Sequence, residues 1–300
     1  MSAARAAPPI WKVALRLGRV SNLPTVWTNV AAGAWLAGGR PRPATLVLLS
    51  LAMSLFYVGG MFLNDAFDRE IDARERPERP IPAGLVRAGH VLLAGFGLLF
   101  AGELVVAIST PITDAGGGPI VAGAALAAAI VIYDRWHKQN PLGPVLMGLC
   151  RALVYATAAL AAGAGWGSSA VVGGALAAWA YLVGLTYAAK QERLDRLGRL
   201  WPLGLLAAPF VYGIGMYGLH PSALHVAAQA ALLVVIAYAV RLLRGHAPDR
   251  FPRAVAALIA GVSLLDAGLV ASAGGSAAAI LITALGFPAT LWMQRWVRGT

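Results

Sequence analysis

The sequence predicts an all-α protein, a polytopic transmembrane bundle of nine to ten helices. Three observations lead to this prediction: 59% of the 300 residues are apolar, only 12% are charged, and long apolar runs recur along the chain. Because a helix rises about 1.5 Å per residue, a run of about twenty apolar residues crosses the hydrocarbon core of a bilayer. This composition excludes an ordinary soluble domain.

The predicted crossings follow one another with short polar connections. In chain order they cover residues 20–39, 44–65, 91–110, 117–134, 142–163, 168–189, 202–218, 223–243, 252–273 and 276–296. Only the Gly274-Gly275 turn separates the last two, so nine and ten crossings both remain open. No boundary for a second domain is visible, and residues 1–300 are expected to form one transmembrane domain.

Basic residues are distributed unevenly between the two sides of the predicted bundle. With the amino terminus placed inside, 22 of the 24 Lys and Arg residues are counted on one side, leaving only Arg40 and Arg42 outside. The positive-inside rule assigns the basic side to the cytoplasm and makes the cell membrane the expected location. The net charge of +11 therefore reflects topology, and nucleic acid is not an expected partner.

An acidic cluster follows the second predicted crossing. Residues 64–72 read NDAFDREID, in which Asp65, Asp68 and Asp72 are spaced i, i+3 and i+7 and would share one helix face. Carboxylates this close repel one another unless positive charge lies between them. Mg²⁺ takes one or two carboxylates and completes its shell with water and phosphate oxygens, so the pattern favours a metal-bridged diphosphate. The alternative is a solvated acidic loop neutralised by neighbouring arginines.

A second polar segment follows the sixth predicted crossing, at residues 187–201. Glu192 and Asp195 offer carboxylates and Gln191 offers a neutral oxygen. Four basic residues offer charge for phosphate: Lys190, Arg193, Arg196 and Arg199. Basic residues at helix ends are also ordinary topology signals. Because ionisable groups in membrane segments are often functional, Lys190 and Asp195 are the two candidates selected here.

The first motif carries a resemblance to a known family. NDAFDREID, followed by RPERPIPAG, resembles the NDxxDxxxD and RPIPxG signature of the UbiA superfamily of intramembrane prenyltransferases. The second signature of that superfamily reads Y-x-x-x-D-x-x-x-D; here Tyr187 is followed by Gln191 and Asp195, with Glu192 beside the replaced Asp. The runs LGRVSNLPTVWTNVAAG and YDRWHKQNPLGPVLMGLCRALVY are similar to the EboC-like branch of these membrane proteins.

The resemblance implies a fold, a reaction and a set of site residues. The fold is a bundle of nine helices around a central cavity, and the reaction is Mg²⁺-dependent transfer of a prenyl group from an isoprenyl diphosphate to a small acceptor. One Mg²⁺ would be held by Asn64, Asp65, Asp68 and Asp72, and a second by Gln191, Glu192 and Asp195. The implied catalytic residues are Asp65, Asp68, Asp195 and Lys190. Arg79, Lys138 and Lys190 would contact the diphosphate.

Several alternatives stay open at this point. Asn22 and Tyr187 either line the acceptor end or only form hydrogen bonds between helices. A transporter usually places such charges near the membrane midplane, whereas these lie at one face. A weakened relative would bind polyprenyl diphosphate without transferring it. The phosphatidyl-group transferase pattern D-x-x-D-G-x-x-A-R is absent, because Asp68 is followed by Arg69-Glu70.

The sequence sets neither the acceptor, nor the prenyl length, nor the oligomeric state. Aromatic rings, tetrapyrroles and haem are acceptors in the superfamily, and the EboC-like resemblance adds a polar, cyclitol-like molecule. Two further carboxylates, Glu103 and Asp266, fall inside predicted crossings. They are expected to pair with helix ends or to be hydrogen-bonded between helices, in preference to a catalytic function.

Overall fold

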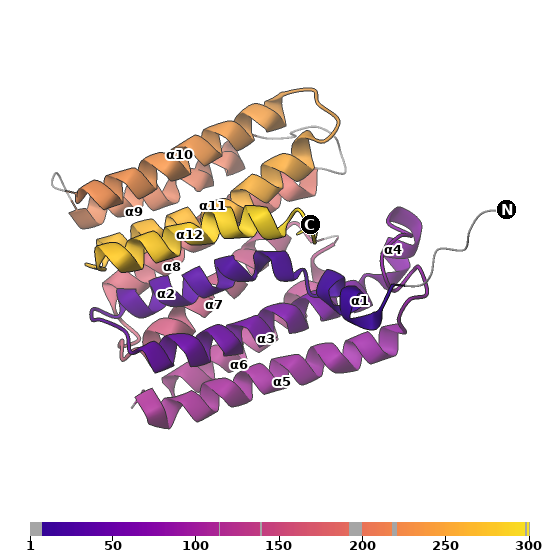
Figure 1. Cartoon of the computed structure of the whole chain (residues 1–300), viewed down its shortest axis with the longest axis horizontal. Coiled ribbons are helices and arrows are strands. Elements are labelled where there is room, and N and C mark those ends of the chain that lie inside the picture. Colours follow the sequence, from indigo (N-terminus) through magenta and orange to yellow (C-terminus); the bar gives the residue numbers. More distant parts are fainter. Residues whose placement is uncertain are drawn as a thin grey trace.

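A computed structural model describes residues 8–113, 115–138, 140–191, 200–217, 221–297 and 299. The regular structure in these ranges is helical, with no strand, which confirms the predicted all-α class. The long helices lie side by side in a bundle (Figure 1). Seven of the described helices are long and apolar enough to cross a membrane: α3, α5, α6, α7, α8, α10 and α11. The protein is therefore a multi-pass membrane protein.

Each predicted crossing overlaps one helical segment. These segments are α2 (Leu23–Leu36), α3 (Pro43–Phe67), α5 (Ala88–Thr113), α6 (Gly118–Trp136), α7 (Gly143–Ala161), α8 (Ser169–Lys190), η3 (Trp201–Ala207) with α9 (Ala208–Tyr217), α10 (Ala223–Arg244), α11 (Arg250–Ser272) and α12 (Ala277–Met293). Three shorter helices are α1 (Ile10–Leu17), η1 (Val20–Asn22) and α4 (Arg69–Glu75). The last two crossings are separate helices, and Gly274 in the turn between them has a φ of 74°.

Helix α11 lies at the centre of one half of the bundle. Of its most apolar stretch, 89% is buried, whereas the corresponding share for α5 is 28%. It packs against α2, α8, α10 and α12. Since a membrane offers no hydrophobic driving force between helices, close backbone approach supplies much of the packing. At Gly33 of α2, for instance, a Cβ would lie only 2.7 Å from the carbonyl oxygen of Tyr155 in α7.

The acidic motif lies where α3 ends, at one end of the bundle that we name the charged end. Helices α1 and α4 lie at this end, on the right in Figure 1. The sequence predicted one helix through Asp65, Asp68 and Asp72, but α3 stops at Phe67 and α4 begins at Arg69. Asp68 caps the first helix, and its carbonyl oxygen accepts from the backbone N–H of Asp72 at 2.8 Å. The three carboxylates remain close although they belong to two helices.

The segment before α2 brings a further charge to the same place. Helix α1 buries Val13 and Leu17 and exposes Ile10 and Trp11, as an amphipathic helix at a membrane surface would. Arg19, directly after it, has a left-handed backbone with a φ of 42°. This conformation is unfavourable for a residue with a side chain and indicates that surrounding contacts hold it.

Candidate functional site

A cavity of about 320 Å³ opens at the charged end between α2, α3, α6, α7, α8 and α11. Its polar lining includes Arg19, Asp68 and Lys138. Its apolar lining includes Phe56 of α3 and Leu126 of α6. The cavity therefore joins a charged mouth to an apolar interior, which are the two environments that a lipid diphosphate requires.

Two arginines hold the carboxylate of Asp65. Its Oδ1 lies 3.0 Å from Nη2 of Arg19 and 3.2 Å from Nη1 of Arg79. Arg79 also contacts Oδ2 of Asp72 at 2.6 Å, so it joins the end of α3 to α4. Asp65 is 5% exposed and Asp72 is 1% exposed. Buried charges of this kind are tolerated only when they are paired and hydrogen-bonded, so this cluster of charges is mutually dependent.

Lys138 occupies the position between the other carboxylate oxygens. Its Nζ lies 3.1 Å from Oδ2 of Asp68 and 3.9 Å from Oδ1 of Asp72. Both oxygens are buried, and apart from these contacts with Lys138 they accept no hydrogen bond from any described residue. Burial raises the pKa of Asp68, and the Lys138 ammonium opposes that rise. Oδ2 of Asp68 and Oδ1 of Asp72 therefore both face the same ammonium group.

His137 lies next to Lys138 but does not carry a positive charge itself. Its Nε2 is 3.7 Å from Oδ2 of Asp68. Burial, together with the Lys138 charge, lowers the pKa of His137 to about 4. The imidazole is therefore neutral at physiological pH, and Lys138 is the charged partner of Asp68.

The donor set fits Mg²⁺ only in combination with a phosphorylated ligand. Over the described ranges, no group of three or more His, Cys, Asp or Glu side chains is arranged to hold a metal. Two carboxylate oxygens, those of Asp68 and Asp72, do converge on a cation position. Because Mg²⁺ commonly takes one or two carboxylates and fills its shell with water and phosphate oxygens, this number suffices.

Asn64, the remaining member of the first predicted set, faces Asp134. Its Nδ2 donates to Oδ1 of Asp134 at 3.2 Å, and its Oδ1 is 3.5 Å from Nη2 of Arg19. Asp134 lies near the end of α6, is 3% exposed and lines the cavity. Asp134 was not among the residues predicted from the sequence, and Arg19 was interpreted there only as a topology signal. The spacing of Asp134 and Lys138, four residues apart near a helix end, was the available signal.

The second predicted set is only partly described. Glu192 and Asp195 lie outside the described residues, as do Arg193, Arg196 and Arg199. Lys190 donates to the backbone carbonyls of His137 at 3.0 Å and Asn140 at 2.8 Å, so it joins α8 to the α6–α7 connection. The described ion pairs of Asp65, Asp68 and Asp72 are with other residues.

Helix α8 presents a different face to the cavity from the one predicted. Its lining residues are Leu182, Leu185, Thr186 and Ala189, which follow helical spacing. Tyr187 is half-buried, and neither it nor Gln191 belongs to that lining.

Asn22 lines the cavity and also joins three parts of the chain. Its Nδ2 donates to the Tyr57 hydroxyl at 3.1 Å and to the Gly299 carbonyl at 2.9 Å. Its Oδ1 accepts from Nε2 of Gln294 at 3.1 Å. The interhelical hydrogen bonding considered for Asn22 is therefore present in the fold, at a position that still borders the cavity.

The two intramembrane carboxylates have different surroundings. Asp266 of α11 accepts hydrogen bonds from Thr28 and Asn29 of α2 and from Tyr155 of α7, so it is hydrogen-bonded between helices as expected. Glu103 of α5 has two buried carboxylate oxygens that accept no hydrogen bond from described residues. Its carboxylate lies against Gly123 of α6, so a Cβ at position 123 would clash with a carboxylate oxygen of Glu103. The expected hydrogen bond of Glu103 is not found there.

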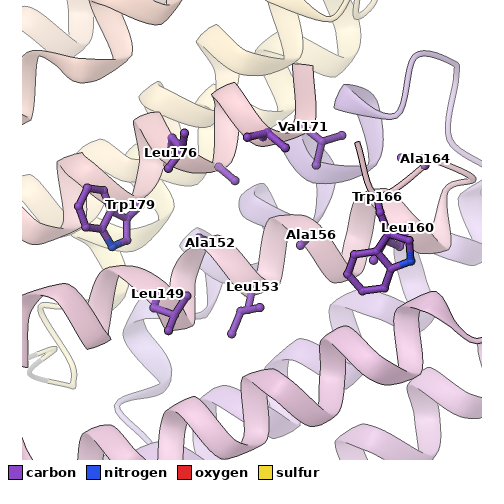
Figure 2. A pocket seen from close by; sticks show the side chains of 13 residues that line it. Leu149, Ala152, Leu153, Ala156, Leu160, Ala164, Trp166, Val171, Leu176 and Trp179 are labelled. Atoms are coloured by element: carbon purple, nitrogen blue, oxygen red, sulfur yellow. The ribbon is translucent and has the colours of Figure 1, made fainter. Parts of the chain in front are cut away.

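A second hollow lies between α7 and α8, where Figure 2 shows Leu149 and Trp179 at one end and Leu160 and Trp166 at the other. Its volume is about 330 Å³. None of its lining side chains is ionisable, so it does not qualify as a diphosphate site.

Comparisons with known proteins identify the family of the chain. Residues 25–253 match the model of the UbiA prenyltransferase family. The chain is 30% identical over 266 residues to digeranylgeranylglyceryl phosphate synthase from Methanopyrus kandleri, covering 87% of this chain and 89% of that protein.

Solved structures share the fold. A UbiA homologue from Aeropyrum pernix K1 superposes with a TM-score of 0.63 at 20% identity, covering 84% of this chain and 96% of its own. A UbiA homologue from Archaeoglobus fulgidus, bound to DMAPP and Mg²⁺, gives a TM-score of 0.52 at 14% identity, with 93% and 98% covered.

The fold, the acidic motif and these matches define an enzyme of the prenyltransferase class that is built into a membrane. Within that class, the chain belongs to the UbiA prenyltransferase family.

Proposed function

We propose that the chain catalyses Mg²⁺-dependent transfer of a prenyl group from an isoprenyl diphosphate to a small acceptor. The observation that carries this proposal is the convergence of Asp68 and Asp72 on one cationic point at the mouth of an apolar cavity. The Archaeoglobus fulgidus homologue binds DMAPP with Mg²⁺, which supports the same ligand and ion here. We further propose that residues 1–300 form one domain in the cell membrane, with this site facing the cytoplasm.

In this proposal each part of the charged mouth has a separate task. Asp68 and Asp72, with Asn64 and Asp65 beside them, would hold the ion. Arg19, Arg79 and Lys138 would bind the diphosphate oxygens. When bound, Mg²⁺ would supply positive charge that offsets the charge of the diphosphate. For the second ion site, Gln191, Glu192 and Asp195 remain the predicted ligands, and Lys190 acts through the α6–α7 connection that it contacts.

The reaction follows from the two environments of the cavity. The bond between C1 of the prenyl group and the bridging oxygen breaks, and its electron pair leaves with the diphosphate. Arg19, Arg79 and Lys138 stabilise the charge that develops on this leaving group, because all three line the cavity at its charged mouth. The apolar walls keep water away from the allylic cation. The acceptor then forms the new bond to C1 and loses a proton.

The acceptor class is the finer part of the proposal. The Methanopyrus kandleri relative is named for a glyceryl phosphate product, which favours a glycerophosphate-type acceptor. Aromatic and cyclitol-like acceptors are tested beside it.

The test measures diphosphate release by the purified protein with geranyl diphosphate, Mg²⁺ and each acceptor class. We expect release that requires Mg²⁺ and that falls by at least about 100-fold in Asp68→Asn, the scale of removing an electrostatic contribution to a transition state. Glu70→Gln is the matched control, because Glu70 is exposed and its described ion pair is with Arg69 alone. Equal rates in wild type and Asp68→Asn refute the proposed site. Movement of labelled geranyl diphosphate across vesicles without release supports a transporter instead.

A further inference from the structure

Arg151 is a charged side chain well inside the bundle. It lies eight residues after Gly143, the first residue of α7, which corresponds to roughly 12 Å along the helix axis. It lines the same cavity as Arg19 and Lys138. The sequence analysis counted Arg151 with the cytoplasmic topology signals, but the structure places it within a membrane-spanning helix. A cation at such a depth is costly unless something neutralises it.

Among the described residues the fold supplies no direct ion pair for Arg151; the nearest countercharge that it offers is the carboxylate of Asp266, which interacts with Arg151 through Asn29. The Nη1 of Arg151 donates a short hydrogen bond to Oδ1 of Asn29, a neutral amide. Over the described ranges, no carboxylate lies within ion-pair distance of Arg151. A guanidinium carries five N–H donors, of which Asn29 accepts from one. Because Arg151 lines the cavity and Asn29 accepts from one donor, a ligand in the cavity could accept from donors that Asn29 does not use.

A hydrogen-bond network holds Asn29, the residue that orients Arg151, in place. The Nδ2 of Asn29 donates to Oδ2 of Asp266 at 2.7 Å and to the Tyr155 hydroxyl at 2.9 Å. The amide oxygen of Asn29 is consequently the atom that faces Arg151. Both oxygens of Asp266 are occupied by Thr28, Asn29 and Tyr155. Asn29 and Asp266, each 0% exposed, are thus positioning residues for the guanidinium.

We infer that Arg151 binds an oxyanion of the acceptor, either a carboxylate or a phosphate. The inference rests on the proposed function, because the cluster around Lys138 is reserved there for the diphosphate. A guanidinium pairs with either oxyanion through two parallel hydrogen bonds. Such a bound acceptor lies deeper in the cavity than the diphosphate and presents its nucleophile toward the charged mouth, where C1 of the prenyl group lies.

The test uses benzoate and benzamide, which have the same shape and differ in charge. Their binding to the purified full-length protein is measured by calorimetry, with and without Mg²⁺ and geranyl diphosphate. We expect benzoate to bind wild type at least about tenfold more tightly than benzamide, and Arg151→Gln to lose about 10- to 100-fold in benzoate affinity, as for a hydrogen bond to a charged group. Arg135→Gln is the matched control, since Arg135 is exposed near the end of α6 and faces the Phe67 ring.

The outcomes separate this inference from the proposed function. Absence of geranyl diphosphate binding refutes the proposed function, whereas the benzoate comparison in the ligand-free protein still tests Arg151. Unchanged benzoate affinity in folded Arg151→Gln overturns the inference. Should that variant fail to fold, wild type is labelled with phenylglyoxal and the modified arginines are located by mass spectrometry. Benzoate, and not benzamide, must protect Arg151; equal labelling with both compounds overturns the inference.

Discussion

Removal of the Arg79 side chain tests how much the charged groups at the mouth of the cavity contribute to the free energy of unfolding. Among the described residues, only Arg79 contacts both Asp65, at 3.2 Å, and Asp72, at 2.6 Å, and these carboxylate side chains are 7% and 1% exposed. Arg79→Ala therefore removes the closest partner of buried Asp72, which keeps only the 3.9 Å contact with Lys138, while Asp65 keeps Arg19. Breaking a buried pair in this way costs about 3–5 kcal/mol. We expect that loss in the free energy of unfolding, measured with denaturant in detergent micelles at pH 7.

Two comparisons make the result interpretable. Arg69→Ala removes an ion pair of similar length, 3.1 Å, whose side chains are 50% and 75% exposed, and should change stability by less than about 1 kcal/mol. Adding Asp72→Asn to Arg79→Ala should recover part of the loss, because it removes the buried charge that has lost its closest partner. If Arg79→Ala costs no more than Arg69→Ala, the carboxylates do not depend on Arg79, and the account of the mouth as one coupled cluster fails.

Three further predictions concern the helices around this site. The pKa of His137 is lowered from 6.5 to about 4, so between these pH values the unfolded chain binds more protons than the folded chain. The free energy of unfolding should therefore fall by about 3 kcal/mol as the pH drops from 6.5 to 4. His137→Gln should remove this part of the pH profile. Gly33→Ala should cost about 1–3 kcal/mol by overpacking against Tyr155, whereas Gly97→Ala, with nothing within 4 Å of its Cβ, should not destabilise. Tyr155→Phe should cost about 1–3 kcal/mol, because Asp266 and Asn29 each lose a hydrogen-bond partner. Tyr238→Phe is the control and should be nearly neutral, because Tyr238 is exposed. Equal shifts in melting temperature for the two variants would contradict the network.

The helices were predictable because their signal is local. An apolar run such as 223–243 needs no partner to be recognised, and the structure places α10 at Ala223–Arg244. The break between α3 and α4 was not predictable from spacing, because helical periodicity continues through Asp68 in the sequence. The chain bends where its apolar run ends and where Arg79 contacts the carboxylates of both helices.

The composition of the site was less accessible, because it depends on contacts between distant segments. Arg19 meets Asp65, 46 positions later, and Asn64 meets Asp134, 70 positions later. No local pattern reports such pairs. Lys190 illustrates the opposite case, in which a residue with suitable chemistry donates to backbone carbonyls of a neighbouring connection. Sequence shows which groups are present, whereas packing decides which of them meet.

Basic residues posed the largest difficulty for interpretation in this chain. The positive-inside rule offers one interpretation for most of the 24 Lys and Arg residues, and that interpretation conceals the few whose surroundings differ. Arg69 and Arg135 are exposed and fit the rule, while Arg19 is held in a left-handed backbone against a buried carboxylate and Arg151 lies inside α7. A membrane helix gains nothing from a guanidinium at such a depth unless something binds it. Depth within the bundle and the nature of the contacting groups are therefore the features by which the cations proposed as functional differ from the exposed ones.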